Sequence, residues 1–553
     1  MSTERRRKTD ITGAGRSTSR AKRMPASSST EAGARGTRCL QALVVTVDQA
    51  SDTAQWYTVA KQLQLVSLEL CEACRAAHTF HLRVDDDTPT TLLATVDDPY
   101  PTDEEGLSSR VPRLRARRVT WELPSLYLLG SQIEAFADME ELYFDSGFNG
   151  SLAVRAWPSR LRIIDMDDVS LFNQPIERVA WPTSLEYLWC GGSFNQPIEG
   201  VAWPNSLYQL EFGDEFNQPI EAVQWPEKLR VLNLRGEFNQ PIEGVTWPKS
   251  LLELELGDGF NQPIANVAWP PSLEELDIGY GFDQPIQGVV WPTSLLRLTF
   301  DSTPHESGGG GNFNQPTEGV AWPPLLQHLT FGYSFNQPIG GVAWPQSLQD
   351  LTFGSDFNQP IEGVKWPTSL VRIELRGAFN HPIEGVKWPA SLRQIELGGA
   401  FNKPIEGVKW PPSLQKLGFG QDFNQPVERV TWPTSLRQLA FGRDFNQPIG
   451  GDKWPTSLEE LELGENFDQS IHGTKWPSLR RLRLTGAFRH SLQCLGSAMP
   501  ALERFALYFR DDKARYSLLR GIEWPALLTH LEVCADAKLD GVSIPSHVSL
   551  VSS

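Results

Sequence analysis

Four side chains near the N-terminal end of the chain could coordinate a metal ion. They are Cys71, Cys74, His78 and His81. Thiolate and imidazole ligands suit zinc, but a zinc finger has a much longer gap between its Cys and His pairs. On a helix the four positions would rise by about 1.5 Å per residue, which is too long a stripe for four ligands to converge. We therefore expect no metal site and keep these residues as a weak candidate.

The rest of the sequence contains no recognisable catalytic motif. The nine His are scattered along the chain, and no nucleophile elbow, His-Glu-x-x-His motif or dinucleotide fingerprint occurs. Residues 308–311 are four consecutive glycines, but the Lys-Ser/Thr that completes a phosphate-binding loop does not follow them. The sequence therefore predicts neither an enzyme nor a bound cofactor.

Charge and composition restrict the partners and the compartment. The 553 residues carry a net charge of −17, and because residues 1–38 carry +7, the remainder carries −24. Such an acidic body argues against binding to a nucleic-acid backbone. Six Cys form no disulfide framework, no apolar run is long enough for a membrane span, and the N-terminus lacks a signal-peptide core. We expect an intracellular protein, cytoplasmic or nuclear, that binds neither nucleic acid nor membrane.

Residues 1–38 are rich in Arg, Ser, Thr, Gly and Ala and are predicted to be a disordered basic tail. Two basic clusters, Arg5–Lys8 and Arg20–Arg23, have the separation of a bipartite nuclear-import signal. A plain solvated tail and an organelle transit peptide fit the same composition. All three interpretations remain open.

A block of 22 residues dominates the rest of the chain. Its leading Phe recurs every 22 residues from Phe172 to Phe282 and again from Phe313 to Phe467, with one insertion between the two runs. A fixed period of this length is typical of a solenoid, in which each coil contacts only its neighbours. The segment Leu-x-x-Leu-x-Phe predicts one short strand per coil, and such strands must stack in parallel. The Pro residues of each block leave no room for a crossover helix.

The apolar positions of the block predict the core. In the coil that starts at Phe172, we expect Phe172, Ile176, Val179 and Trp181 to pack against the inward side of the strand. Seventeen of the 19 Trp fall at this Trp position, Trp121 included, and we interpret them as a buried column rather than as an exposed stacking platform.

An Asn follows the leading Phe in nearly every block. Its side chain can accept a backbone N–H of one turn and donate to a C=O of the adjacent coil, which predicts a hydrogen-bond ladder. Asp283 and Asp468 replace this Asn and lose the donor, so they are expected to be local weak points. The predicted ladder consists of Asn173, Asn195, Asn217, Asn239, Asn261, Asn314, Asn336, Asn358, Asn380, Asn402, Asn424 and Asn446.

The weakening of the repeat toward both ends sets the predicted boundaries. Residues 39–120 keep only period-2 alternation and are interpreted as a degenerate N-terminal cap. The solenoid is expected over 121–535, with regular coils at 172–488 and a loop insertion at 301–312. Residues 536–553 are expected to be a C-terminal tail.

The block Phe-Asn-Gln-Pro-Ile with Trp-Pro-x-Ser-Leu resembles the FNIP repeat, a 22-residue variant of the leucine-rich repeat, over about residues 148–490. Trp before Pro, where that family often has Leu, is a conservative departure. The resemblance implies a mainly β, right-handed solenoid with one parallel sheet on its concave face and few or no regular helices on the convex side. It also implies a role in protein interaction, in some members alongside an F-box or a kinase domain, whose motifs are not recognisable in this sequence.

The strand residues between the inward positions vary from coil to coil and are predicted to face outward on the concave sheet. Their charge changes from acidic at Glu253–Asp277 to mixed or basic toward Arg437. A rigid frame with variable residues is a common binding surface. The predicted interaction surface consists of Tyr208, Glu211, Glu253, Glu255, Glu274, Glu275, Asp277, His328, Arg372, Arg393, Lys416 and Arg437.

We expect a monomeric, non-catalytic scaffold that binds a basic or polar segment of a protein partner through the acidic stretch. Charge reversal of Glu253, Glu255, Glu274 and Glu275 should then abolish capture of that partner. Two alternatives remain: a carbohydrate-binding solenoid that uses Tyr187, Trp189 and Tyr208, and a substrate adaptor of a ubiquitin ligase without a recognisable F-box.

Overall fold

The structure is a computed structural model that describes residues 81–84, 118–121 and 139–552, apart from the gaps 145–146, 155, 167–170, 301–310, 451–452, 510–512, 535–536 and 538. The chain divides into two compact units, Met1–His78 and Thr79–Ser553, and the described residues belong to the second. The predicted tail 1–38 and most of the predicted cap 39–120 therefore lie outside the described residues. The same is true of Cys71, Cys74 and His78, whereas His81 begins the first strand.

The described residues contain one sheet of 21 strands. Each strand pairs in parallel with the next one along the chain; for example, Leu254 lies opposite Leu276. The predicted single parallel sheet is thus confirmed. The strands are β1 (His81–Val84), β2 (Arg118–Trp121), β3 (Glu141–Phe144), β4 (Ile163–Met166), β5 (Tyr187–Trp189), β6 (Gln209–Glu211), β7 (Val231–Asn233), β8 (Glu253–Glu255), β9 (Glu275–Asp277), β10 (Arg297–Thr299), β11 (His328–Thr330), β12 (Asp350–Phe353), β13 (Arg372–Leu375), β14 (Gln394–Leu397), β15 (Lys416–Gly418), β16 (Gln438–Ala440), β17 (Glu460–Leu463), β18 (Arg481–Thr485), β19 (Arg504–Tyr508), β20 (His530–Val533) and β21 (Ser549–Ser552).

The repeated apolar positions form continuous columns in the core. Phe172 and Ile176 are fully buried, and Val179 and Trp181 are only 4% and 7% exposed. Successive Phe rings stack with their centroids about 6 Å apart, as Phe238 and Phe260 do at 6.2 Å. Seven neighbouring pairs of Trp rings stack in the same way. The predicted buried Trp column is therefore present.

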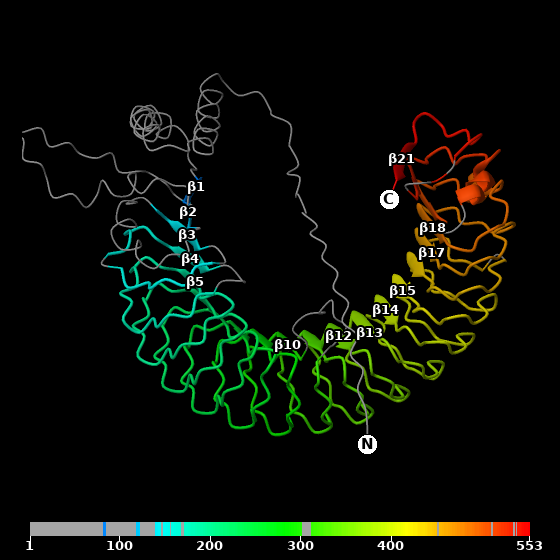
Figure 1. Cartoon of the computed structure of the whole chain (residues 1–553). Coiled ribbons are helices and arrows are strands. Elements are labelled where there is room, and N and C mark those ends of the chain that lie inside the picture. The colour runs from blue at the N-terminus through cyan, green and yellow to red at the C-terminus, as the bar shows by residue number, and fades with distance from the viewer. Residues whose placement is uncertain are drawn as a thin grey trace, which may run out of the picture. The chain divides into compact units, whose positions relative to one another are not determined.

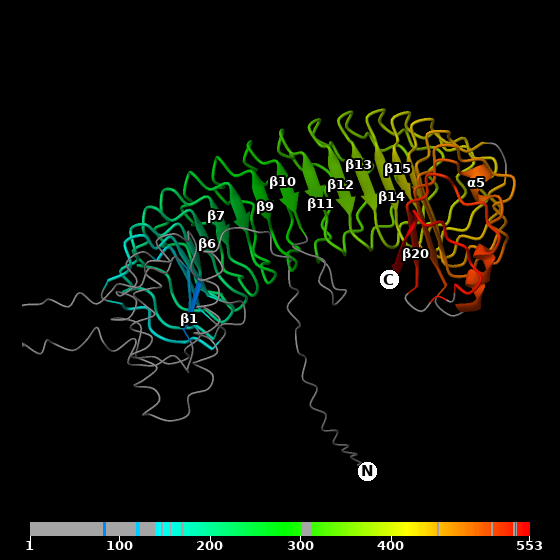
Figure 2. The same cartoon turned by 90° about the horizontal axis from the view of Figure 1, so that it is seen from above.

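Unequal spacing on the two sides of a coil explains the curvature of the array. Hydrogen bonds hold neighbouring strands about 4.8 Å apart, whereas the Trp rings Trp269 and Trp291 on the other side of the coil are 6.2 Å apart. The coils must therefore curve toward the sheet. Figure 1 shows the strands from β5 to β18 on the inner side of this curve, and Figure 2 shows them side by side.

Helical structure is scarce in the described residues, as the Pro-rich blocks predict. It consists of one short α-helix, α5 (Leu495–Ala498), and one 3₁₀ helix, η1 (Lys513–Leu519), both near the C-terminal end. None of the described helices has the length and apolar composition needed to cross a membrane.

Two sequence predictions about the ends of the solenoid are wrong. Residues 536–553, predicted as a tail, contain β21, which pairs with β20 over four residues, so the sheet continues to Ser552. Trp121, assigned to the Trp column, instead ends the strand β2, where it pairs opposite Phe144. Both errors arise because the atypical end coils keep the strand but lose the rest of the block.

Candidate interaction face

The inner face of the sheet is formed by alternate strand residues. In β8 the central Leu254 points into the core and is 2% exposed, while Glu253 and Glu255 flank it on the opposite face. Parallel pairing without slippage then places Glu253 beside Glu275 and Glu255 beside Asp277. The 22-residue period thus aligns equivalent positions of successive coils into rows.

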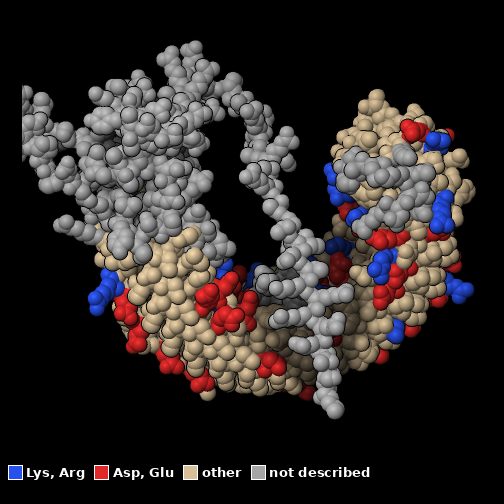
Figure 3. Space-filling model, viewed as in Figure 1, with Lys and Arg blue, Asp and Glu red and all other residues tan. Residues whose placement is uncertain are grey.

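Five carboxylates gather on this face and are called the acidic patch: Glu253, Glu255, Glu274, Glu275 and Asp277. Figure 3 shows acidic side chains clustered on the inner face, in the region that Figure 1 places between β5 and β10. Two guanidinium groups reach the patch, Arg297 at 3.4 Å from Glu275 and Arg235 at 3.9 Å from Glu255. Among the described residues, no ion pair or hydrogen bond reaches the carboxylates of Glu253 and Glu274.

The acidic patch is electrostatically strained. Burial raises the pKa of Glu253, and the neighbouring charges of Glu275 and Glu274 raise it further. Burial also raises the pKa of Glu255, an effect that Arg235 partly opposes. The folded chain therefore holds these protons more tightly than the unfolded chain does, so ionisation of the patch destabilises the fold.

We predict that Glu253→Gln raises the melting temperature at neutral pH. Because the pKa of this carboxyl is raised in the folded state, its full contribution to stability is present below the ordinary Glu pKa of about 4.3. That contribution is lost as the pH rises through the folded-state pKa. The gain in stability from Gln should therefore be full at pH 7. It should vanish below a pH of about 4, where Glu253 is protonated in both the folded and the unfolded chain. Thermal unfolding at the two pH values measures it, with Glu199→Gln on an outer turn as the control. A Glu253→Gln gain that does not depend on pH would refute this assignment.

A polar and aromatic cluster borders the acidic patch on the N-terminal side. Arg235 bonds to Glu211 at 3.0 Å, and its guanidinium lies over the ring of Trp189, 5.8 Å from the centroid. Glu211 is only 6% exposed. Burial, followed by the charges of Glu211 and Asp165, raises the pKa of Tyr187. The sequence predicted Glu211 on the exposed surface, whereas in the structure Arg235 covers its carboxylate.

Arg235 was missed, although the sequence carries a signal for it. The flanking coils have Gly213 and Gly257 at this position, where an added Cβ would lie 2.1 and 2.3 Å from the preceding coil's backbone. In the Arg235 coil the turn is different, and Gly236 adopts a φ of +52°. The change from Gly to Arg-Gly therefore marks the coil in which a side chain can project from the turn.

The same change occurs at Arg376, which precedes Gly377 with a φ of +45°. Arg376 bonds to Glu374 at 2.9 Å, and Arg372 bonds to the other oxygen of the same carboxylate. Glu374, like Glu211, is almost fully buried. In the next coil Arg393 has no ion pair among the described residues. Arg372, Arg376 and Arg393 are called the basic patch.

Beyond the basic patch, charges on the inner face mostly neutralise one another. Arg480 pairs with Glu503 at 3.1 Å, and Arg481 pairs with Glu460 at 3.0 Å. Figure 3 shows blue and red side chains interleaved at this end. Three predicted surface residues also have partners: His328 with Asp350, Lys416 with Glu396, and Arg437 with Glu459.

The structure places all twelve predicted Asn in a ladder, but with different donors. Each Asn Oδ1 accepts the backbone N–H of the Asn or Asp in the next coil, as Asn402 accepts from Asn424 at 3.0 Å. In most coils the second bond comes from a Gln side chain, as from Gln425 to Asn402 at 2.9 Å. The Asn amide nitrogen is not the donor to the adjacent coil that sequence reasoning assumed.

The Asp positions consequently lose no bond in the ladder. Asp283 accepts from the N–H of Asn314 and from Gln315, both at 2.9 Å. Asp468 accepts from the N–H of Arg489 at 2.9 Å. Asp283 and Asp468 were expected to be weak points because they would lose a ladder hydrogen bond, and that reason does not apply.

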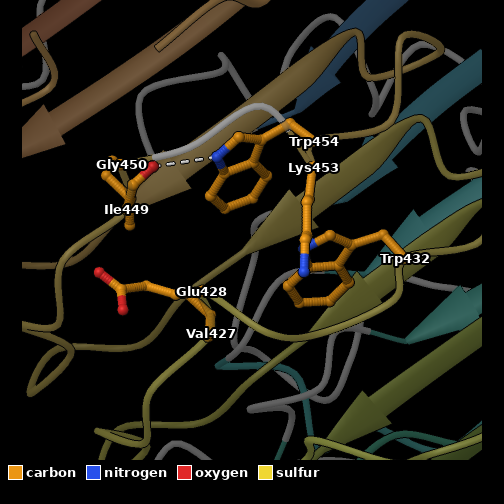
Figure 4. Close-up of a pocket in the computed structure, with 7 residues that line it drawn as sticks. All are labelled: Val427, Glu428, Trp432, Ile449, Gly450, Lys453 and Trp454. Carbon is orange, nitrogen blue, oxygen red and sulfur yellow. Dashed lines mark hydrogen bonds between the residues drawn. The ribbon is translucent and has the colours of Figure 1, made fainter. Parts of the chain in front are cut away.

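A crevice lies between two neighbouring coils, near Trp432 and Trp454. Trp432, Lys453 and Trp454 line it, together with Glu428 and the turn at Ile449 (Figure 4). The indole N–H of Trp454 donates to the carbonyl of Ile449 at 3.0 Å, a bond that the stacked Trp of other coils do not make. The crevice contains no cluster of His, Cys, Asp and Glu that could hold a metal ion, and none occurs elsewhere among the described residues.

Comparisons with known proteins agree with this geometry. The family model described as FNIP Repeat matches residues 172–215, 194–237, 238–281, 260–303, 313–356, 335–377, 379–422 and 401–444. The crystal structure of CroV588, described as a novel circular leucine-rich-repeat protein, is similar at 33% identity and a TM-score of 0.60, and the match covers 75% of this chain and 66% of that one. TLR13, solved as a complex with ssRNA13, is similar in fold at 14% identity and a TM-score of 0.50, with 76% of this chain and 60% of that chain covered. This chain thus spans less than two thirds of each of these two proteins. No match to a curated protein was found.

Proposed function

This chain belongs to the FNIP repeat family of leucine-rich-repeat-like solenoids, and we propose that it is a non-catalytic scaffold that binds a basic segment of a protein partner on its inner face. One observation carries the proposal. The acidic patch concentrates carboxylates whose repulsion costs stability, on a rigid sheet whose other charges are largely paired. Uncompensated charge of this kind is common where a surface serves binding rather than stability.

The chemistry of the patch selects the partner. Lys and Arg side chains would replace the missing counter-charges of Glu253 and Glu274, and charge complementarity would also speed association. A nucleic-acid ligand, as in the TLR13 complex, would bring phosphates toward carboxylates of the same sign. Binding to a basic segment should therefore weaken as salt is added.

The observations favour a protein partner over a carbohydrate. A sugar platform needs an open aromatic ring, but Arg235 lies over Trp189, and burial of Tyr187 is sufficient to raise its pKa. Tyr208 is 45% exposed, but its ring is not open either, because Arg230 lies over it at 5.6 Å from the ring centre.

The test is capture of partners by the full chain from cells, with proximity labelling to identify them. The double variant Glu253→Lys, Glu274→Lys should reduce the affinity of the captured partner by about tenfold or more, since like charges then oppose its basic residues. The matched control, Glu177→Lys with Glu199→Lys, makes the same charge change on the outer turns and should bind normally. Equal capture by both variants would exclude the acidic patch as the binding face. Labelling with residues 1–38 deleted also reports whether the basic tail directs the protein to the nucleus.

A further inference from the structure

The inner face carries two patches of opposite charge at a fixed separation. The acidic patch lies on β8 and on β9 with the residue before it, while the basic patch lies at the two ends of β13 and directly before β14. Four strand steps separate β9 from β13, and at about 4.8 Å per step the gap is about 20 Å. Because the sheet is continuous, this separation is rigid.

The basic patch keeps an excess of positive charge. Arg372 and Arg376 both bond to the carboxylate of Glu374, a residue that is only 7% exposed. The two arginine side chains remain 46% and 50% exposed. Arg393 adds a third cation, and Lys416 beside it is neutralised by Glu396 at 2.8 Å. The patch therefore presents two positive charges that nothing on its own strands balances.

One row of side chains on the strands between the patches is neutral and small. Thr299, Thr330 and Thr352 lie opposite one another on β10, β11 and β12. In the row beside them, His328 bonds to Asp350 at 2.7 Å. Arg297 of β10 lies in the same row as His328 and pairs with Glu275 at 3.4 Å. The threonine row itself offers no charge to a ligand and no large side chain to obstruct one that crosses it.

We propose that the partner segment is bipolar: a block of basic residues over the acidic patch and a block of acidic residues over the basic patch, joined by a neutral span that crosses the threonines. The inference rests on the proposed function and specifies the partner's charge pattern. An extended chain advances by at most about 3.5 Å per residue, so the neutral span needs at least about six residues to bridge about 20 Å. With a shorter span, part of one block must lie over the threonine row instead of over its patch.

Three synthetic peptides test this with the full chain. The first carries four Lys, an eight-residue Gly-Ser spacer and four Glu; the second replaces the Glu block with Ser; the third shortens the spacer to two residues. Calorimetry or fluorescence anisotropy at low salt gives the affinities. We expect the first peptide to bind at least tenfold tighter than the second and the third.

A charge variant assigns the effect to the basic patch. Arg372→Gln with Arg393→Gln should lower the affinity of the first peptide to that of the second, and should leave the second unchanged. Arg376 stays on Glu374 in this variant, so the buried carboxylate keeps a partner. Arg480→Gln with Arg483→Gln makes the same charge change farther along the face and should alter neither affinity.

The outcomes separate the two claims. Equal binding of the first and second peptides overturns the bipolar partner while the acidic patch remains a binding site. A spacer of two residues that binds as well as one of eight overturns it in the same way. No binding by any of the peptides overturns both the inference and the proposed function.

Discussion

Gly354→Ala should destabilise the solenoid by about 3 kcal/mol, near the upper end of the range for overpacking. Gly354 follows β12, where the backbone of one coil approaches the backbone of the coil before it. A Cβ at this position would lie 1.9 Å from the carbonyl oxygen of Gly332. Because the obstacle is backbone, the two coils would have to separate locally. Urea unfolding and amide hydrogen exchange of the flanking strands would measure the loss.

A glycine in the preceding turn provides the matched control. An added Cβ at Gly340 meets no atom within 4 Å, and its φ lies outside the left-handed region. Gly340→Ala should be neutral or should stabilise the chain by up to about 1 kcal/mol, because the unfolded chain loses freedom. Similar urea midpoints for the two variants would mean that the coils do not stack as closely as described.

Asn402→Ala should cost about 2 kcal/mol, within the range for leaving a partly buried hydrogen-bond donor without an acceptor. The substitution removes the acceptor of the backbone N–H of Asn424 and of the Gln425 side chain. The Gln425 side chain keeps a longer bond to the backbone carbonyl of Asn402, at 3.3 Å, whereas the Asn424 N–H keeps no acceptor among the described residues. The loss should appear as a lower urea midpoint and faster exchange of the Asn424 amide.

The control for this variant is Asn402→Asp, which keeps the acceptor oxygen. Asp283 shows that a carboxylate fills the place, since it accepts both bonds of the next coil at 2.9 Å. We expect Asn402→Asp to retain most of the stability that Asn402→Ala loses. If the two variants are equally unstable, the amide nitrogen matters and the ladder as described is wrong.

Much of the fold could be predicted because the same residue types recur at the same positions in many coils. The spacing of Phe172, Ile176, Val179 and Trp181 identified the buried columns, and the structure buries all four. The spacing of Leu-x-x-Leu identified one strand per coil and hence a parallel sheet. Where the block decays, as at Trp121 and in the last coil, one copy gave too little signal to place the strand.

The inner face was only partly predictable. The period of 22 fixes the register, so Glu253 and Glu275 could be placed in one row from the sequence alone. Which charges neutralise each other depends on residues that differ from the repeat consensus. The most important are Arg235 and Arg376, which stand where most coils have glycine. Sequence reasoning therefore placed Glu211 on the open surface, although Arg235 covers it.

The most direct test of the binding face is carboxyl footprinting of the full chain with and without its captured partner. Carbodiimide coupling modifies accessible Asp and Glu, and mass spectrometry reports the extent at each residue. We predict that the partner slows modification of Glu253 and Glu274 severalfold and leaves that of Glu177 and Glu199 on the outer turns unchanged. Slower modification of the outer turns, with Glu253 and Glu274 as reactive as in the free chain, would contradict it.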